Sequence, residues 1–265
     1  MKTYLRLIRW PNLLIIAYCM YVLRYSLFIP MLETKGVEPV LSGFNFFLIV
    51  LACMFTAAAG YIINDIYDRA IDKINKPERL IVGEHISVRS AENLYIVFNL
   101  TAIAIGIYVS YSIQLRSLSL LFPIVAGILY FYSTTYKSIL LFGNVLVAAL
   151  SAIIPFTVIL FDLPLIHQKY KPFIGISGFN FNPEIIAFIA YAVFAFLISF
   201  FRELIKDIED FEGDKAFGKY TMPVVLGTRW SKNTALLLLV ILLVTLGYTT
   251  LKYLHDPISL TYLIG

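Results

Sequence analysis

The sequence predicts an all-α protein that crosses a lipid bilayer several times as one bundle of helices. Of its 265 residues, 60% are hydrophobic and only 14% are charged, and the mean hydropathy is +0.82. A soluble domain is about 45–50% apolar and about 25% charged, so this chain cannot bury its apolar side chains in a core surrounded by water. A membrane-spanning helix needs about 20 mostly apolar residues. Seven segments meet this requirement: 12–32, 43–63, 91–112, 117–135, 139–161, 184–205 and 233–252.

The rest of the chain favours a single transmembrane domain over residues 1–265, because no separate soluble part stands out. An eighth apolar segment begins near Pro257 and is cut short at Gly265. Arg24 lies inside the first segment, and we expect its side chain to extend toward the outer interface. The net charge of +4 is small and gives no indication of nucleic-acid binding.

Loop charge predicts the orientation, because Lys and Arg concentrate on the cytoplasmic side of a cell membrane. Counting the crossings brings four basic regions to one side, which we therefore expect to face the cytoplasm. These regions carry Lys2, Arg6 and Arg9; Arg69, Lys73, Lys76, Arg79 and Arg89; Lys137; and Lys206, Lys215, Lys219, Arg229 and Lys232.

Two acidic clusters lie at the ends of hydrophobic segments on this same side. Residues 64–72 read Asn-Asp-Ile-Tyr-Asp-Arg-Ala-Ile-Asp, and residues 207–214 read Asp-Ile-Glu-Asp-Phe-Glu-Gly-Asp, with Glu203 one turn upstream. On a helix, Asn64, Asp68 and Asp72 fall along one face. Asp207, Asp210 and Asp214 are spaced three and four residues apart, which also keeps them on one face. Carboxylates beside a membrane are costly unless they bind something.

The spacing of the clusters indicates a magnesium site. Stacked carboxylates repel one another unless a cation lies between them. Oxygen ligands without His or Cys suit Mg²⁺, which binds through one or two carboxylates together with waters and phosphate oxygens. Two such faces are therefore expected to hold Mg²⁺ around one diphosphate. Neighbouring basic side chains are expected to neutralise the remaining phosphate charge: Arg69, Lys73, Lys76, Arg79, Lys206 and Lys215.

Two other interpretations of the clusters are a solvated charged loop and the ion site of a membrane transporter. The matching spacing, the shared membrane face and the position at helix ends disfavour a plain loop. A transporter more often holds its carboxylates near the midplane, between structural repeats with broken helices, and no repeat stands out in this chain.

Residues 64–72 resemble the NDxxDxxxD motif of the UbiA superfamily of intramembrane prenyltransferases, and residues 207–214 resemble its second motif, DxxDxxxD. The resemblance covers about residues 5–230. It implies a bundle of nine transmembrane helices around a central cavity, so we expect this chain to be incomplete at its C-terminal end relative to the family. It implies a metal and diphosphate site formed by Asn64, Asp68, Asp210 and Asp214, with Asp72, Asp207 and Glu203 in support.

The resemblance further implies Mg²⁺-dependent transfer of a prenyl group, geranylgeranyl or similar, from its diphosphate to a hydrophobic acceptor. We expect Asp68, Asp214, Tyr132 and Lys137 to carry catalysis, with the Tyr132 ring stabilising the allylic cation. Arg9 and Asn12 are expected to contact the acceptor. The motifs look most like those of members that prenylate lipid-type acceptors, as in geranylgeranylglyceryl phosphate geranylgeranyltransferases. An aromatic acceptor of the quinone or chlorophyll type is the alternative.

Overall fold

The computed structural model describes residues 2–174 and 180–251, apart from the side chain of Arg79. These residues form helices joined by loops, and seven helical stretches among them are long and apolar enough to cross a membrane. The prediction of an all-α multi-pass membrane protein is therefore confirmed. The predicted eighth segment lies outside the described residues. The seven stretches are Trp10–Glu33, Gly43–Asn75, Val88–Ser112, Arg116–Thr134, Phe142–Phe173, Asn182–Glu209 and Thr228–Thr249.

Several stretches contain more than one helical element. The first half of the chain contains α1 (Lys2–Leu7), α2 (Trp10–Val22), the π-helical η1 (Leu23–Phe28), α3 (Ile29–Glu33), α4 (Gly43–Asn75), η2 (Pro77–Arg79), α5 (Val88–Ser112), η3 (Arg116–Leu120) and α6 (Leu121–Thr134). The second half contains η4 (Tyr136–Ser138), α7 (Phe142–Leu160), α8 (Leu163–Tyr170), η5 (Lys171–Phe173), α9 (Asn182–Glu209), α10 (Phe211–Ala216), α11 (Met222–Leu226) and α12 (Thr228–Thr249).

The first acidic cluster belongs to a helix that is longer than a bilayer requires. α4 has 33 residues and is about 50 Å long, whereas the hydrocarbon core of a membrane is about 30 Å thick. The hydroxyl of Ser42 accepts a hydrogen bond from the backbone N–H of Asn45 and caps the start of α4. From there α4 continues without a break through residues 64–72, so the first cluster lies on a regular helix.

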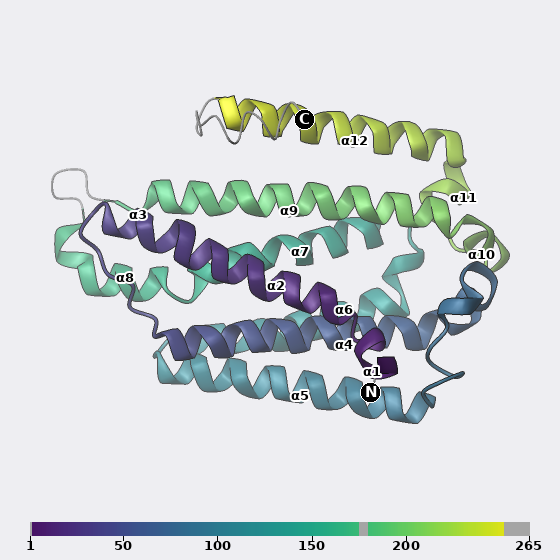
Figure 1. Ribbon diagram of the computed structural model, residues 1–265, viewed down its shortest axis with the longest axis horizontal. Coiled ribbons are helices and arrows are strands. Elements are labelled where there is room, and N and C mark those ends of the chain that lie inside the picture. The colour runs from purple at the N-terminus through teal and green to yellow at the C-terminus, as the bar shows by residue number, and fades with distance from the viewer. Residues whose placement is uncertain (1, 175–179, 252–265) are drawn as a thin grey trace.

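The long helices lie side by side, with α4 packed along α5 and α7 packed along α9 (Figure 1). α12 packs mainly on α9. We call the end of the bundle that carries residues 64–72 and 207–214 the acidic end, and the end that carries α3 and α8 the far end. In Figure 1 the acidic end is on the right and the far end on the left.

The far end is closed by a packed apolar core that includes Phe28, Phe46, Phe161 and Phe188. The core also encloses Arg24, which is 2% exposed and forms an ion pair of 2.9 Å with Asp162.

Arg24 also donates to the backbone oxygen of Leu41 and lies 4.5 Å from the ring centroid of Phe46. Asp162 in turn accepts the backbone N–H groups of Val40 and Leu41. The prediction that Arg24 extends to the interface is therefore wrong, because a carboxylate from the end of α7 pairs with it inside the protein.

Candidate active site

The two acidic clusters face a common cavity at the acidic end, with a volume of about 590 Å³. We call it the wide cavity. Because α4 is a regular helix here, its residues four apart point the same way. Asp68 is only 8% exposed and Asp214 only 3%, so these carboxylates are held inside the protein. The residues of the two clusters that line the wide cavity are Asn64, Asp65, Asp68, Asp72, Asp207, Asp210 and Asp214.

The second cluster does not lie on one continuous helix. α9 ends at Glu209, Asp210 is the junction residue, and α10 begins at Phe211. The side chain of Asn75, at the end of α4, holds this junction. Its Nδ2 donates to the backbone oxygen of Asp210 at 3.1 Å, and its Oδ1 accepts the backbone N–H of Gly213 at 2.8 Å. The amide of Asn75 thus connects the helix that carries the first cluster to the helices that carry the second.

Lysine ammonium groups lie among the carboxylates. Lys137 Nζ is 2.5 Å from Asp68 Oδ1 and 3.5 Å from Asn64 Oδ1. Lys219 Nζ is 3.0 Å from Asp214 Oδ1 and 3.7 Å from Asp68 Oδ1, so it bridges the two clusters. Burial lowers the pKa of the Lys137 ammonium group, and the charge of Asp68 opposes this shift.

Lys219 was not predicted as a site residue, although a local sequence signal for its position was present. Gly218 has φ of +65° and follows α10, as glycine commonly does where a helix ends in the left-handed region. The N–H of Gly218 bonds the oxygen of Lys215, and the N–H of Lys219 bonds the oxygen of Asp214. This is a Schellman motif, and it turns Lys219 back beside Asp214.

Only some of the predicted diphosphate-binding residues reach the wide cavity. Lys76 and Lys206 line it, and Lys76 Nζ is 2.6 Å from Asp210 Oδ1. The predicted places of Arg69, Lys73 and Lys215 require correction, because none of the three is among the residues that line the cavity. Each directly follows an inward aspartate on a helix, and neighbouring helical residues point about 100° apart.

The three side chains have other surroundings. Arg69 donates its Nε to the backbone oxygen of Ile66, Lys73 is exposed, and the Lys215 ammonium lies 5.6 Å from the ring centroid of Phe211. The side chain of Arg79, also predicted to bind diphosphate, is outside the described part of the structure.

Glu203 lies apart from the other predicted metal ligands. It does not line the wide cavity but lies on the wall of a second, narrower cavity that adjoins it. It pairs with Arg202 at 2.9 Å and with Lys206 at 3.8 Å. Asp207 is held by the amide of Asn144, which donates to Asp207 Oδ2 at 2.8 Å.

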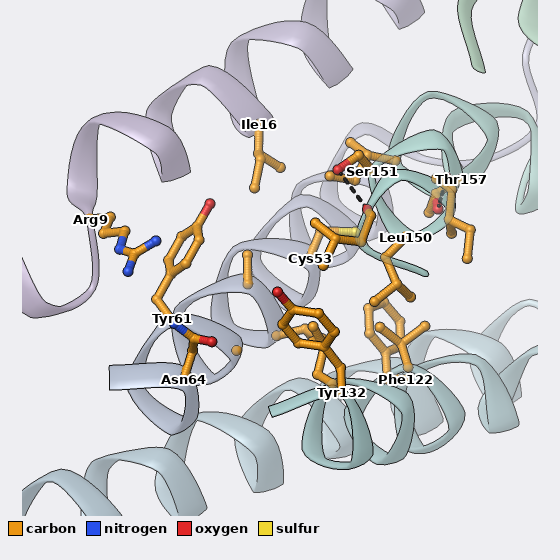
Figure 2. Close-up of a pocket in the computed structure, with 18 of the residues that line it drawn as sticks. Arg9, Ile16, Cys53, Tyr61, Asn64, Phe122, Tyr132, Leu150, Ser151 and Thr157 are labelled. Atoms are coloured by element: carbon orange, nitrogen blue, oxygen red, sulfur yellow. Dashed lines mark hydrogen bonds between the residues drawn. The ribbon is translucent and has the colours of Figure 1, made fainter. Parts of the chain in front are cut away.

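A second, narrow cavity of about 170 Å³ runs from this site into the bundle (Figure 2). Four residues line both cavities and so mark where they meet: Arg9, Asn64, Tyr132 and Lys206. Beyond this junction the lining is mostly apolar, with Ile16, Val125, Leu150 and Ile154 among its members. A polar compartment therefore leads into an apolar one, with the Tyr132 ring at the boundary.

The predicted acceptor residues lie on the wall formed by the first helices. Arg9 has φ of +50° at the break between α1 and α2, and this bend brings its side chain against α4. Its guanidinium is 2.8 Å from Asp65 Oδ1 and 4.8 Å from the ring centroid of Tyr61. Asn12 donates to the Tyr61 hydroxyl at 3.4 Å. Both Arg9 and Asn12 line the wide cavity together with Arg6 and Trp10.

The donor set of the wide cavity fits Mg²⁺ bound together with a diphosphate. Among the described residues, no three carboxylate, imidazole or thiol groups converge closely enough to hold a metal ion by themselves. Mg²⁺ commonly uses one or two carboxylates and takes its other ligands from waters and phosphates. The buried hydroxyl of Thr221 also lines this cavity and has no hydrogen-bond partner within the described part of the chain. An oxygen of a bound ligand would satisfy it.

Two solved structures show that the chain shares a known fold. A UbiA homolog from Archaeoglobus fulgidus bound to DMAPP and Mg²⁺ aligns with a TM-score of 0.58 and 21% identity, over 99% of this chain and 84% of that one. A structure described as a digeranylgeranylglyceryl phosphate synthase aligns with a TM-score of 0.55 and 24% identity, over 94% of this chain and 77% of that one.

Curated relatives are more similar in sequence. The digeranylgeranylglyceryl phosphate synthase of Methanobrevibacter smithii is 32% identical over 82% of this chain and 70% of its own length. The enzyme of the same name from Saccharolobus solfataricus is 34% identical over 80% of this chain and 64% of its own length. The profile of the UbiA prenyltransferase family matches residues 13–265. The resemblance of the two motifs is thereby confirmed, and the chain belongs to the UbiA prenyltransferase family.

Proposed function

We propose that this chain transfers a prenyl group from a Mg²⁺-bound prenyl diphosphate to a lipid-type acceptor that carries a phosphate, such as geranylgeranylglyceryl phosphate. One observation carries the proposal. Two acidic clusters on different helices face one polar cavity, and that cavity leads into an apolar one. The first compartment suits a metal diphosphate and the second suits an isoprenoid chain. The names of the curated relatives support the same reaction.

The residues proposed to hold the metal are those of the two clusters that line the wide cavity: Asn64, Asp68, Asp72, Asp207, Asp210 and Asp214. Bound Mg²⁺ supplies charge stabilisation to the departing diphosphate. The ammonium groups of Lys137 and Lys219 contact Asp68 and Asp214, so they are positioned to donate to phosphate oxygens held at the same carboxylates. Lys76 and Lys206 add positive charge from the side of the second cluster.

The reaction breaks the bond between the first carbon of the allylic chain and the diphosphate oxygen, which keeps the electron pair. The hydroxyl oxygen of the acceptor then bonds to that carbon, and the hydroxyl proton passes to the departing diphosphate. Tyr132 lies where the two cavities meet, so its ring is positioned to stabilise positive charge on the allyl group by a cation–π interaction. The Tyr61 ring is not assigned this role, because it is already in contact with the guanidinium group of Arg9. The apolar lining beyond Tyr132 keeps water away from the cation.

Arg9, Arg6 and Asn12 are proposed to recognise the head group of the acceptor. They come from the first helices and line the wide cavity. Guanidinium groups bind phosphate through paired hydrogen bonds, and this favours an acceptor with a phosphate over a neutral aromatic one. Arg9 is paired with Asp65, so a phosphate would compete with that carboxylate.

The acidic end is proposed to face the cytoplasm across the cell membrane. Lysines and arginines are concentrated on the elements at this end of the bundle, with Lys2 and Arg6 on α1, Lys73 near the end of α4 and Lys215 on α10. This distribution is the one that the positive-inside rule describes. Labelling of a cysteine placed at exposed Lys73, with a membrane-impermeant reagent on sealed vesicles of known orientation, tests the assignment.

The experiment for the reaction uses the full chain purified in detergent. It is mixed with Mg²⁺, labelled geranylgeranyl diphosphate and a panel of acceptors that includes geranylgeranylglyceryl phosphate and homogentisate. We expect label in the lipid acceptor, loss of transfer with a chelator, and loss of transfer in Asp68→Ala and Asp214→Ala. Lys73→Ala, outside the cavity on the same helix, is the matched control and should retain activity. Transfer to the aromatic acceptor alone would overturn the acceptor assignment, and full activity of both aspartate variants would overturn the metal site.

A further inference from the structure

The narrow cavity has a defined deep end. On α4 its lining runs from Asn64 to Cys53, and on α6 from Tyr132 to Leu121, with Phe122 next to Leu121. The residues of each pair are eleven positions apart, which corresponds to about 16 Å along a helix. Figure 2 shows Phe122 and Thr157 at one end of the cavity, with Arg9 and Asn64 at the other.

Phe122 lies at this end, and its ring has no room to move back toward α5. It is 3% exposed and belongs to the packed core of the far end. Behind it is Gly106, on α5. A Cβ atom built on Gly106 would overlap two ring carbons of Phe122 and come within 3.2 Å of a third. The absence of a side chain at position 106 is therefore what allows the ring to lie against α5 and leaves the space in front of it free.

The geometry points to Phe122, seated on Gly106, as the determinant of the length of prenyl chain that the narrow cavity accepts. This inference rests on the proposed function, because it assigns the narrow cavity to the prenyl chain of the donor. With the diphosphate held at the acidic end, a longer chain reaches further toward the far end. Its last isoprene unit meets the Phe122 ring, which is similar in size to one such unit.

Substitutions at Gly106 and at Phe122 are expected to change the depth of the narrow cavity in opposite directions. A methyl group at position 106 would overlap the Phe122 ring, so we expect the ring to move away from α5 into the cavity and to shorten it. Removing the ring deepens the cavity. In a protein that already lacks the ring, a methyl group at position 106 has nothing to push, so its effect on chain length is lost.

The test measures binding of geranyl, farnesyl and geranylgeranyl thiolodiphosphates, which resist turnover, to the full chain in the presence of Mg²⁺. We expect Gly106→Ala to weaken geranylgeranyl binding relative to geranyl binding by roughly tenfold, since the last unit loses its burial. Phe122→Ala should shift the same ratio toward the longest donor. The double variant should show the ratio of Phe122→Ala alone.

Each ratio compares the binding of two donors to the same variant protein. Partial loss of folded protein lowers both values equally and does not change the ratio. Gly127→Ala is the matched control, because a Cβ atom at this position of α6 has nothing within 4 Å. A ratio that is unchanged in both Gly106→Ala and Phe122→Ala overturns the inference even when transfer activity is normal. Transfer to no acceptor, with the expected shifts in binding, would instead overturn the proposed reaction and leave this inference standing. Failure of the unaltered chain to bind any of the three donors would overturn both.

Discussion

Asn75 and Gly213 connect the two acidic clusters: the Oδ1 atom of Asn75 accepts the backbone N–H of Gly213 at 2.8 Å, while its Nδ2 atom donates to the backbone oxygen of Asp210 at 3.1 Å. A Cβ atom on Gly213 would lie within 2.6 Å of three side-chain atoms of Asn75. The position of α10 relative to α4, and with it the separation of Asp214 from Asp68, therefore depends on a glycine at 213.

The first prediction is that Gly213→Ala lowers the affinity for Mg²⁺. The added methyl group displaces the Asn75 amide and breaks two hydrogen bonds, each worth about 1 kcal/mol. We expect the Mg²⁺ concentration for half-maximal activity to rise by at least about tenfold, as measured by metal titration of prenyl transfer. Glu212→Ala, an exposed neighbour on α10, is the control. Identical titrations for the two variants would contradict this role for the Asn75 contact.

The second prediction concerns Lys219, which bridges Asp68 and Asp214. Lys219→Met keeps the length of the side chain and removes its charge, so the donor diphosphate loses a charged hydrogen-bond donor. We expect affinity for a prenyl thiolodiphosphate to fall by roughly 10- to 100-fold, measured by calorimetry at saturating Mg²⁺. Lys215→Met, on the exposed face of α10, should bind as tightly as the unaltered chain. Equal losses in both variants would indicate a general effect of surface charge instead.

The third prediction distinguishes a catalytic role of the Tyr132 ring from a role of its hydroxyl group. If the ring stabilises the allylic cation, Tyr132→Phe retains the π face and most of the activity. Tyr132→Leu removes the face, and a desolvated cation–π contact is worth about 2 kcal/mol, so kcat should fall by roughly 30-fold. Single-turnover measurements at saturating donor isolate this step. A large loss in Tyr132→Phe with little further loss in Tyr132→Leu would assign the role to the hydroxyl.

The fourth prediction concerns the buried ion pair at the far end. Arg24→Met leaves the carboxylate of Asp162 uncompensated, and Asp162 is 0% exposed, so we expect a loss of about 3–5 kcal/mol in stability. Adding Asp162→Asn removes the stranded charge while keeping an oxygen for the backbone N–H groups of Val40 and Leu41. The double variant should therefore be more stable than Arg24→Met alone, as judged by thermal unfolding in detergent.

An exposed pair at the same end provides the comparison. Lys169 and Glu38 are 3.9 Å apart, with side chains that are 50% and 84% exposed, and exposed pairs contribute about 0–1 kcal/mol. Lys169→Met should leave the unfolding temperature nearly unchanged. Transfer activity of folded Arg24→Met should be normal, because Arg24 lines neither cavity. An unfolding temperature of Arg24→Met equal to that of Lys169→Met would show that the buried pair is not a source of stability.

The sequence alone determined the features that depend on local periodicity and composition. The seven spans follow from runs of apolar residues, and their helices occur where they were expected. Asn64, Asp68 and Asp72 share a face of α4 because a helix repeats every 3.6 residues, and all three line the wide cavity. Tyr132 and Lys137 also line this cavity, and their catalytic roles stay predictions.

Only the tertiary structure decided which polar groups from distant parts of the chain meet. Arg24 pairs with Asp162, and Asn75 is hydrogen-bonded to Gly213, although each pair is far apart in sequence. Neither contact leaves a pattern in the neighbouring residues. The sequence also gives no reason to distinguish Lys215 from Lys219. In the structure, the Schellman motif at Gly218 places Lys219 beside Asp214, whereas Lys215 is exposed to solvent. The reason is physical: a helix sets direction over a few residues, while the pairing of distant side chains depends on how whole helices pack.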